Sequence, residues 1–301
     1  MSLSPNFSLI LRSTLLAAAA AVSLGAQAQG TWNLVDVGSS GGQCTQQATN
    51  SGTFDNAYGC LNGGRNVTIS SWSSDRGTGG NAQAAGTGSN FANAHLSNQG
   101  TAGFGSKNRT EGLSVGSPDH AFDSIAPGTM DLMLLDFGST NVVLSQIGLG
   151  WKSGTGAGDI TVMRWVGTKP AFGTAAVTVG GSDTLSATTC TGGVVTGCWS
   201  LVGSYDDLAT DGSNPYGQNA VNTGAAASTA SSWWMISTFN SAFNNNSHTC
   251  IGGDGTCTSG NDSFKINFIN TTVSQVPVPG SLALAGLGLL AAFAARRRIA
   301  A

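Results

Sequence analysis

Residues 130–151 read MDLMLLDFGSTNVVLSQIGLGW, two apolar runs on either side of Gly138-Ser139-Thr140. Each run has the length of a strand, and a short turn between two such runs is typical of a β-hairpin. Residues 159–166 follow as DITVMRWV, which places Ile160 and Val162 on one face of a third strand. Strands with turn signals about every 10 to 15 residues favour a sandwich over alternating βαβ units.

Similar patterns extend outward from this block in both directions. The final pattern places Phe264, Ile266 and Phe268 on one face, opposite Lys265, Asn267 and Ile269. Residues 73–105 are instead rich in Gly, Asn, Ala and Ser, which predicts a long surface loop with at most an edge strand. The further strands are expected at 31–37, 66–72, 175–179, 199–204, 232–240 and 263–273.

The composition supports an all-β body. The chain of 301 residues has 44 glycines and only 9% charged residues, and Glu111 is its one glutamate. Exposed positions of surface helices normally carry Glu, Lys, Arg and Ala, whereas this chain supplies turn residues. We therefore predict a β-sandwich of jelly-roll-like type with long Gly/Ser/Asn-rich loops.

Six cysteines divide into near neighbours along the chain. In any chain that leaves the cytoplasm, an even number of cysteines indicates disulfides. Sequential pairing is favoured here, although fifteen pairings are formally possible. A zinc site is the alternative, but the spacings are not those of zinc motifs. The neighbours are Cys44 and Cys60, Cys190 and Cys198, and Cys250 and Cys257.

The C-terminal region has the order of a membrane-targeting signal. Residues 276–280 read VPVPG, an apolar run continues to Ala295, and Arg296, Arg297 and Arg298 follow. Because proline is unfavourable inside a helix, we expect one transmembrane helix over 280–295, which is short for a permanent anchor. The arginines are expected to stay on the cytoplasmic side and stop transfer.

The N-terminal region has the order of a secretory signal. Arg12 precedes a Leu/Ala-rich apolar stretch, and Ala26-Gln27-Ala28 supplies the small-x-small pattern that signal peptidase requires. The sequence therefore divides into a signal helix at 1–28, an exported β-rich domain at 29–273 and a sorting signal at 274–301. Gln29 is the expected mature N-terminus, and the expected partners are the Sec machinery and signal peptidase.

These C-terminal residues resemble the PEP-CTERM sorting signal of bacterial proteins that exosortase processes. The likeness rests on Pro277, Val278 and Pro279, the GLGLL run at 286–290 and the arginine cluster, and Val278 stands where the family usually has Glu. Residues 117–124 and the strands after them are also similar to exosortase-dependent surface proteins. The resemblance implies a Gram-negative host, a transient stay in the inner membrane, and cleavage at or near Pro277 to Pro279 by exosortase, a membrane peptidase.

Two groups of acidic residues are candidate sites. Between the two apolar ends lie eight basic and fifteen acidic residues, a net charge of −7 that does not suit nucleic acid. Asp119, His120 and Asp123 can bind a metal or move a proton, although local turn formation is the favoured interpretation. For Asp206, Asp207 and Asp211 a solvated turn is likewise favoured over a calcium site, because the spacing departs from the EF-hand.

The seven tryptophans offer a second kind of site. Rings that project from a sheet face stack on sugars, whereas rings within strands are more often core residues. No zinc-protease motif or phosphate loop is present in the sequence, no enzyme activity or cofactor is expected, and a hydrolase remains only a third hypothesis. The tryptophans are Trp32, Trp72, Trp151, Trp165, Trp199, Trp233 and Trp234.

The sequence as a whole predicts a non-catalytic, exported surface or extracellular-matrix protein, in a biofilm or exopolysaccharide context. The alternative is a secreted carbohydrate-binding or calcium-dependent adhesive module.

Overall fold

In the computed structural model, all described residues belong to the unit Gln29–Val273, which we call the compact unit, or body. The structure describes residues 29–35, 43–47, 57–74, 90–107, 120–124, 130–168, 177–178, 184–186, 189–190, 197–210, 219–222, 229–244, 247–258 and 262–273. The expected signal helix and the expected transmembrane helix at 280–295 lie outside these ranges. Within these ranges, no helix has the length and apolar character needed to cross a membrane.

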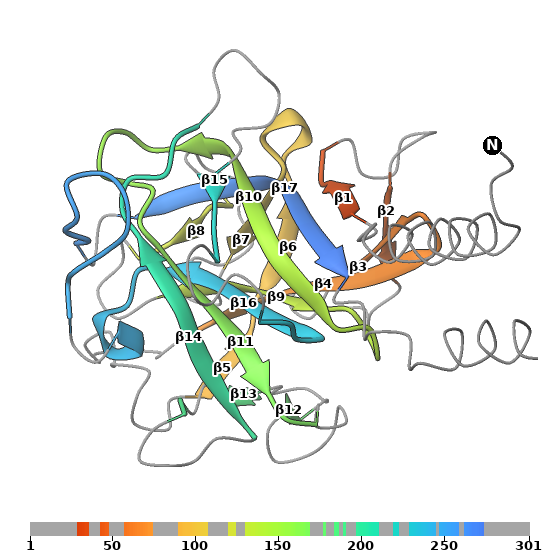
Figure 1. Ribbon diagram of the computed structural model, residues 1–301. Helices are drawn as coiled ribbons and strands as arrows, with labels where there is room; N and C mark the ends of the chain where they lie inside the picture. The colour runs from red at the N-terminus through yellow and green to blue at the C-terminus, as the bar shows by residue number, and fades with distance from the viewer. Residues whose placement is uncertain are drawn as a thin grey trace, which may run out of the picture. The chain divides into compact units, whose positions relative to one another are not determined.

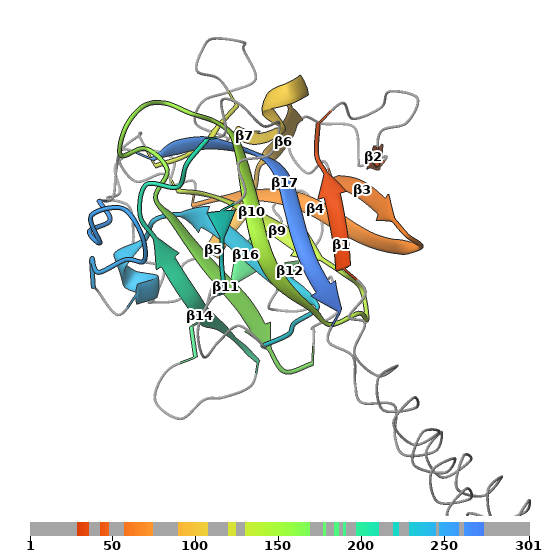
Figure 2. The same cartoon turned by 45° about the horizontal axis from the view of Figure 1, so that its top comes forward.

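Two antiparallel sheets form in the part of the chain that the structure describes (Figures 1 and 2). The smaller sheet has the order β15-β10-β17-β7-β6, with β1 and β8 also paired to β17. Its strands are β1 (Gln29–Asn33), β6 (His95–Asn98), β7 (Phe104–Lys107), β8 (Phe122–Asp123), β10 (Val142–Lys152), β15 (Asn219–Ala220) and β17 (Ser263–Val273).

The larger sheet has the order β12-β13-β5-β4-β9-β16-β11-β14, and β3 joins β2 to β4. Two short 3-10 helices, η1 (Gly100–Ala102) and η3 (Ser241–Asn244), accompany the strands. The strands are β2 (Cys44–Gln47), β3 (Ala57–Asn62), β4 (Arg65–Ser73), β5 (Asn90–Asn93), β9 (Asp131–Asp136), β11 (Ile160–Val166), β12 (Val177–Thr178), β13 (Thr184–Ser186), β14 (Cys198–Tyr205) and β16 (Trp233–Thr238).

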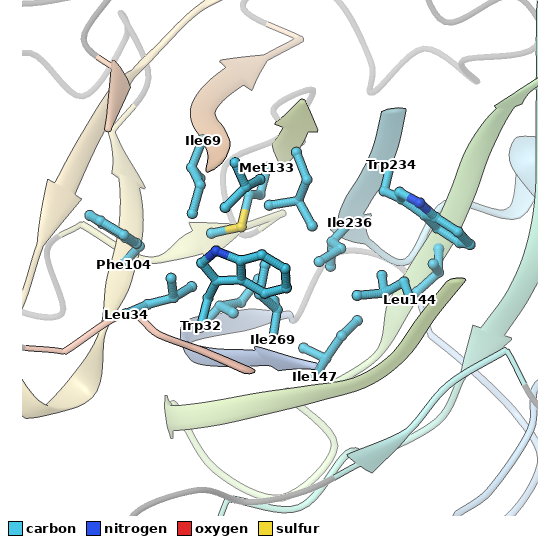
Figure 3. Close-up of a cluster of buried hydrophobic side chains, with 14 of the residues drawn as sticks. Trp32, Leu34, Ile69, Phe104, Met133, Leu144, Ile147, Trp234, Ile236 and Ile269 are labelled. Atoms are coloured by element: carbon cyan, nitrogen blue, oxygen red, sulfur yellow. The ribbon is translucent and has the colours of Figure 1, made fainter. Parts of the chain in front are cut away.

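The main hydrophobic core lies between the two sheets. Trp32 and Ile147 enter it from the smaller sheet, and Ile69, Met133 and Ile236 enter it from the larger one (Figure 3). Because side chains alternate along a strand, the neighbours of these residues in the larger sheet point to its other face. There a second buried cluster contains Trp165, Trp199 and Trp233. The all-β class and the sandwich-like arrangement are thus confirmed, and the jelly-roll topology stays a prediction.

The hairpin predicted at 130–151 is wrong. Both runs are strands, but β9 lies in the larger sheet between β4 and β16, whereas β10 lies in the smaller sheet beside β17. Residues 138–140 therefore connect one sheet to the other. Both β9 and β10 need apolar side chains for the core between them, and that requirement produces the two adjacent apolar runs.

The surface loop predicted at 73–105 is also wrong in part. Phe91 in β5, Leu96 in β6 and Phe104 in β7 are all fully buried. Isolated apolar residues among Gly, Asn and Ser are enough to anchor these short strands, since each contributes one large side chain to a core.

The last strand has the predicted bounds but changes phase within its length. Gly148 of β10 pairs with Phe268, and the next β10 residue, Leu149, pairs with Ile266, so Asn267 is an extra residue on β17. Such a bulge reverses the facing of all later side chains. Phe264, Ile266 and Ile269 consequently belong to the main core, in place of the predicted Phe264, Ile266 and Phe268.

Three disulfides join near neighbours in the sequence. Cys44–Cys60 links β2 to β3, Cys190–Cys198 ties the start of β14 to the segment before it, and Cys250–Cys257 closes the turn before β17. Each sulfur is covalently bonded in this way. The disulfides thus link strands to neighbouring segments of the chain, and their sulfurs are not thiolate metal ligands.

Candidate functional site

The first strand of the compact unit begins beside the end of its last strand. Gln29, the first residue of β1, is the register partner of Thr272, and β17 ends one residue later at Val273. β1 runs antiparallel to β17 (Figure 2), and their register ends at the pair of Asn33 and Phe268. Gln29, the expected mature N-terminus, and Val273, the last residue before the expected sorting signal, therefore lie at the same end of this strand pair.

Polar side chains close the outer edge of β1. Arg65 Nη2 donates a hydrogen bond to the carbonyl of Gln29 at 2.8 Å, and the Asn62 amide donates one to the carbonyl of Thr31. On the same edge, the backbone N–H of Asn33 donates to Oε1 of Gln43 at 2.8 Å. An open strand edge invites pairing with another chain, so these side chains protect β1 from such pairing.

The inner side chains of β1 fix the strand in place. Trp32 and Leu34 are both fully buried in the main core. The Arg65 guanidinium carbon lies 5.5 Å from the centre of a Trp32 ring, within the range of a cation–π contact. Val35 N–H donates to Asn33 Oδ1 at 3.1 Å, a local turn that ends the strand earlier than the predicted residue 37.

A second candidate site is the acidic junction, which we define as Asp159, Asp206, Asp207 and Asp262. Asp159 directly precedes β11, Asp206 and Asp207 follow β14, and Asp262 directly precedes β17. Asp159, Asp206 and Asp262 are buried. Strand ends from both sheets therefore meet at one group of carboxyl side chains.

Backbone N–H groups donate to these carboxyl oxygens. Oδ1 of Asp262 accepts from Asp159 at 3.1 Å, and Oδ1 of Asp159 accepts from Asp207 at 2.8 Å. The other oxygen of Asp159 accepts from Thr258 at 2.9 Å. Asp206 Oδ2 accepts from Gly255 at 2.9 Å in the disulfide-closed turn. The junction thus holds three chain segments together through side chain to backbone hydrogen bonds.

The carboxyl groups of the junction do not titrate alike. Burial raises the pKa of Asp262 to about 8, and the nearby charge of Asp159 acts in the same direction. Burial also raises the pKa of Asp159, with a further contribution from Asp206, although donation from Asp207 and Thr258 opposes the rise. Asp262 is therefore mostly protonated at neutral pH, which limits the repulsion between buried carboxylates.

The candidate calcium residues hold separate parts of the structure. Asp207, at φ 48°, pairs with Lys152 and accepts the N–H of Gly156 at 3.2 Å. Asp206 instead faces the turn at 250–257, and Asp211 lies outside the described residues. Hydrogen bonding to Lys152 lowers the pKa of Asp207. No group of three or more His, Cys, Asp or Glu side chains in the described ranges is placed to hold a metal.

The other acidic candidates lie beside β8. Asp123 is in β8 and pairs with Ser263 of β17, while His120 has a left-handed backbone at φ 64°. A Cβ atom on Gly105 would lie 1.4 Å from the carbonyl oxygen of His120, so the β7 backbone packs directly against this residue. Asp119 lies outside the described residues. The structure thus gives His120 and Asp123 positions in a tight contact between β7, β8 and β17.

Most tryptophan rings belong to the cores. Trp32, Trp199, Trp233 and Trp234 are fully buried, and Trp72 and Trp165 are nearly so. Trp151 on β10 is only partly buried, and Lys265 Nζ lies 4.9 Å from the centre of its ring. Of the seven tryptophans, Trp151 is therefore the candidate for stacking on a sugar.

Sequence reasoning missed Asp159 and Asp262 as members of a site. They are separated by 103 residues, and their common signal is an aspartate immediately before a strand. The expected processing residues Ala26, Ala28, Pro277, Val278 and Pro279 and the stop residues Arg296–Arg298 all lie outside the described residues.

Comparison with known proteins places a sorting signal after the last strand. Residues 275–298 match the family model described as the PEP-CTERM protein-sorting motif. No curated protein and no solved structure matches the chain. The matched residues begin two positions after Val273, the end of β17, and include the proline motif and the arginine cluster. The chain thus carries a PEP-CTERM motif, consistent with an exosortase substrate.

Proposed function

We propose that this protein is a non-catalytic surface or extracellular-matrix protein, exported through the Sec machinery and processed by exosortase at or near Pro277 to Pro279. The apolar segment 280–295 holds it in the inner membrane until that cleavage. The observation that carries the proposal is the sorting motif at 275–298, which follows the body after a single intervening residue, Ser274. The exopolysaccharide matrix of a biofilm is the proposed destination.

The chemistry of the body supports export and an architectural role. Three disulfides suit an oxidising compartment outside the cytoplasm. The buried carboxyl groups of the acidic junction accept hydrogen bonds from backbone N–H groups, whereas a hydrolase would need such groups as its acid and base. We therefore assign the body to display and adhesion.

The processing step has a direct test in the producing bacterium. The mature protein is isolated from strains with and without exosortase, and both its ends are identified by mass spectrometry. We expect a chain that ends near Pro277 in the first strain and at Ala301 in the second. An intact chain ending in Ala301 in both strains contradicts exosortase processing.

Two variants separate the proline motif from the stop signal. Replacing Arg296, Arg297 and Arg298 together by Gln keeps the length and the apolar run but removes the cytoplasmic charge, so retention and processing should fall. Val278→Glu restores the residue usual in the family and should keep or raise processing. Parental processing in the glutamine variant contradicts a role for the arginines, and loss of processing in Val278→Glu contradicts the assignment of residues 277–279 to the proline motif.

A carbohydrate-binding module is the second candidate, and the partly exposed Trp151 beside Lys265 favours it. A glycan array combined with tryptophan fluorescence identifies any sugar that binds saturably. Trp151→Ala should abolish that binding, whereas Leu61→Ala, at a side chain 58% exposed on β3, should not. The same titration with added calcium or chelator tests the calcium-dependent form. Lack of any saturable binding removes this candidate.

A further inference from the structure

We propose that Gln29 is a modification site at which the mature N-terminus closes into a pyroglutamate (5-oxoproline) ring. This inference rests on the proposed export, because it requires removal of residues 1–28. The α-amino nitrogen attacks the side-chain carboxamide carbon, a new C–N bond forms a five-membered lactam, and the amide nitrogen leaves as ammonia. The step involves no oxidation or reduction and consumes no co-reactant.

The position of Gln29 leaves its reacting groups at the surface. The compact unit begins at Gln29, which is also the first residue of β1 and is exposed. Trp32 and Leu34 hold the strand from the core side, and pairing with Thr272 fixes its first position. Cleavage after Ala28 would therefore produce an α-amino group and a carboxamide together at an accessible strand end.

Arg65 supplies the electrostatic reason for the modification. Its guanidinium donates to the carbonyl of Gln29 at 2.8 Å and lies over the Trp32 ring. Because the backbone nitrogen and oxygen of one residue are only about 3 Å apart, a new ammonium on Gln29 would stand close to this cation. Repulsion between the two positive charges disfavours the ammonium and favours the neutral amine, which is the nucleophile for ring closure.

The pyroglutamate ring is electrostatically more favourable beside Arg65 than a free α-ammonium group. A lactam nitrogen is uncharged, so repulsion with Arg65 disappears. It keeps one N–H, and the carbonyl of residue 29 still accepts from Arg65, so the hydrogen bond at the edge of β1 is preserved. A blocked end also resists aminopeptidases, which protects the strand that pairs with β17 in an extracellular setting.

The test uses the full mature protein from the producing bacterium. Its N-terminal peptide is measured by mass spectrometry, with an isotope-labelled peptide that begins in free glutamine added at lysis to report ring closure during handling. We expect the native peptide to begin at residue 29 and to weigh one ammonia less than the free form. Pyroglutamyl aminopeptidase should remove its first residue.

Two variants isolate the chemistry and its electrostatic cause. Gln29→Asn keeps a carboxamide but is one methylene too short for a five-membered lactam, so its N-terminus should remain a free amine. Arg65→Gln keeps a hydrogen-bond donor and removes the charge, so the freshly cleaved protein should cyclise about threefold to tenfold more slowly. An unchanged rate in Arg65→Gln overturns the electrostatic argument.

The failures of the two proposals are distinguishable. A native peptide that begins at Gln29 with a free amine in most molecules overturns the modification and leaves signal removal intact. A peptide that begins elsewhere, or a chain that retains Met1, contradicts the predicted cleavage site itself.

Discussion

The backbone N–H of Asp159 donates to Oδ1 of Asp262 at 3.1 Å, which joins the start of β11 in the larger sheet to the start of β17 in the smaller one. Both residues are buried. An ionised pair at this position would place two negative charges together away from water, whereas a protonated Asp262 avoids that cost. The protonation state of one side chain therefore affects how firmly the two sheets are joined.

Folding stability should fall as the pH rises from 5 to 9. Because the pKa of Asp262 is raised to about 8 in the folded protein, above the unfolded value, its contribution is fully present below the unfolded pKa and is lost as the pH passes through about 8. The expected decrease in the free energy of unfolding is about 2 to 4 kcal/mol. Urea denaturation with disulfides intact measures it, and a flat or rising profile contradicts it.

Asp262→Asn should remove most of this pH dependence. The amide keeps an oxygen that accepts from Asp159 and never ionises, so at pH 9 the variant should exceed the parent protein by about 2 kcal/mol in the free energy of unfolding. Asp254→Asn, in the turn closed by Cys250–Cys257, is the matched control and should keep the parental slope. A parental slope in Asp262→Asn assigns the pH dependence to other groups.

Lys152→Met should weaken the protein only slightly at neutral pH. Lys152 pairs with Asp207, whose side chain is 38% exposed, so solvent screening limits the loss to under about 1 kcal/mol. The pKa of Asp207 is lowered, chiefly by this hydrogen bond, so its contribution exists above the unfolded pKa and disappears as the pH falls through the folded one. Denaturation at neutral pH and at pH 3 should therefore show a smaller acid-induced loss in the variant. An equal loss would show that the pair has no energetic role.

Gly105→Ala should destabilise the body strongly. The added Cβ would lie 1.4 Å from the carbonyl oxygen of His120. The position of a Cβ is fixed by its own backbone and the oxygen belongs to the backbone of His120, so no side-chain rotation relieves the clash. A loss of about 3 kcal/mol or more in the free energy of unfolding is expected. Gly64→Ala, at φ 79° with nothing within 4 Å of its Cβ, should cost about 1 kcal/mol through backbone conformation alone. Thermal melts of the two variants that coincide would contradict the packing of β7 against His120.

Trp32→Ala and Trp151→Ala should differ in their effect. Trp32 is fully buried between the sheets, so its truncation is expected to cost about 3 to 5 kcal/mol. Trp151 is only partly buried on β10, and its truncation should cost under about 1 kcal/mol apart from the lost contact with Lys265. Denaturant midpoints of the two proteins provide the comparison. A similar cost for both would mean that the core does not depend on Trp32.

Local patterns identify strands better than they identify partners. Ser263–Val273 has the predicted bounds. In the strand expected at 66–72, Val67 and Ile69 are separated by one residue and both lie in the main core. The turn at 138–140 is not enough to predict a hairpin correctly. A short connection between two apolar runs fits both a hairpin and a crossover between sheets, and the structure has the crossover. Which strand pairs with which depends on contacts that are distant in the sequence.

The acidic junction is largely hidden in the sequence for the same reason. Asp206 and Asp207 are adjacent and visible together, but Asp159 and Asp262 reach them only through folding. The extra residue Asn267 on β17 is equally hard to foresee, because this bulge has no distinctive side-chain pattern. Periodicity therefore indicates the elements, while the site requires the tertiary structure.

The pairing of Gln29 with Thr272 also determines how the body responds to mechanical load. Tension applied through both ends of the compact unit pulls β1 and β17 apart from their shared end, so their hydrogen bonds rupture in succession instead of shearing together. A chain held at Val273 and pulled at Gln29 would therefore lose the hydrogen bonds between β1 and β17 one after another, starting at the pair of Gln29 and Thr272.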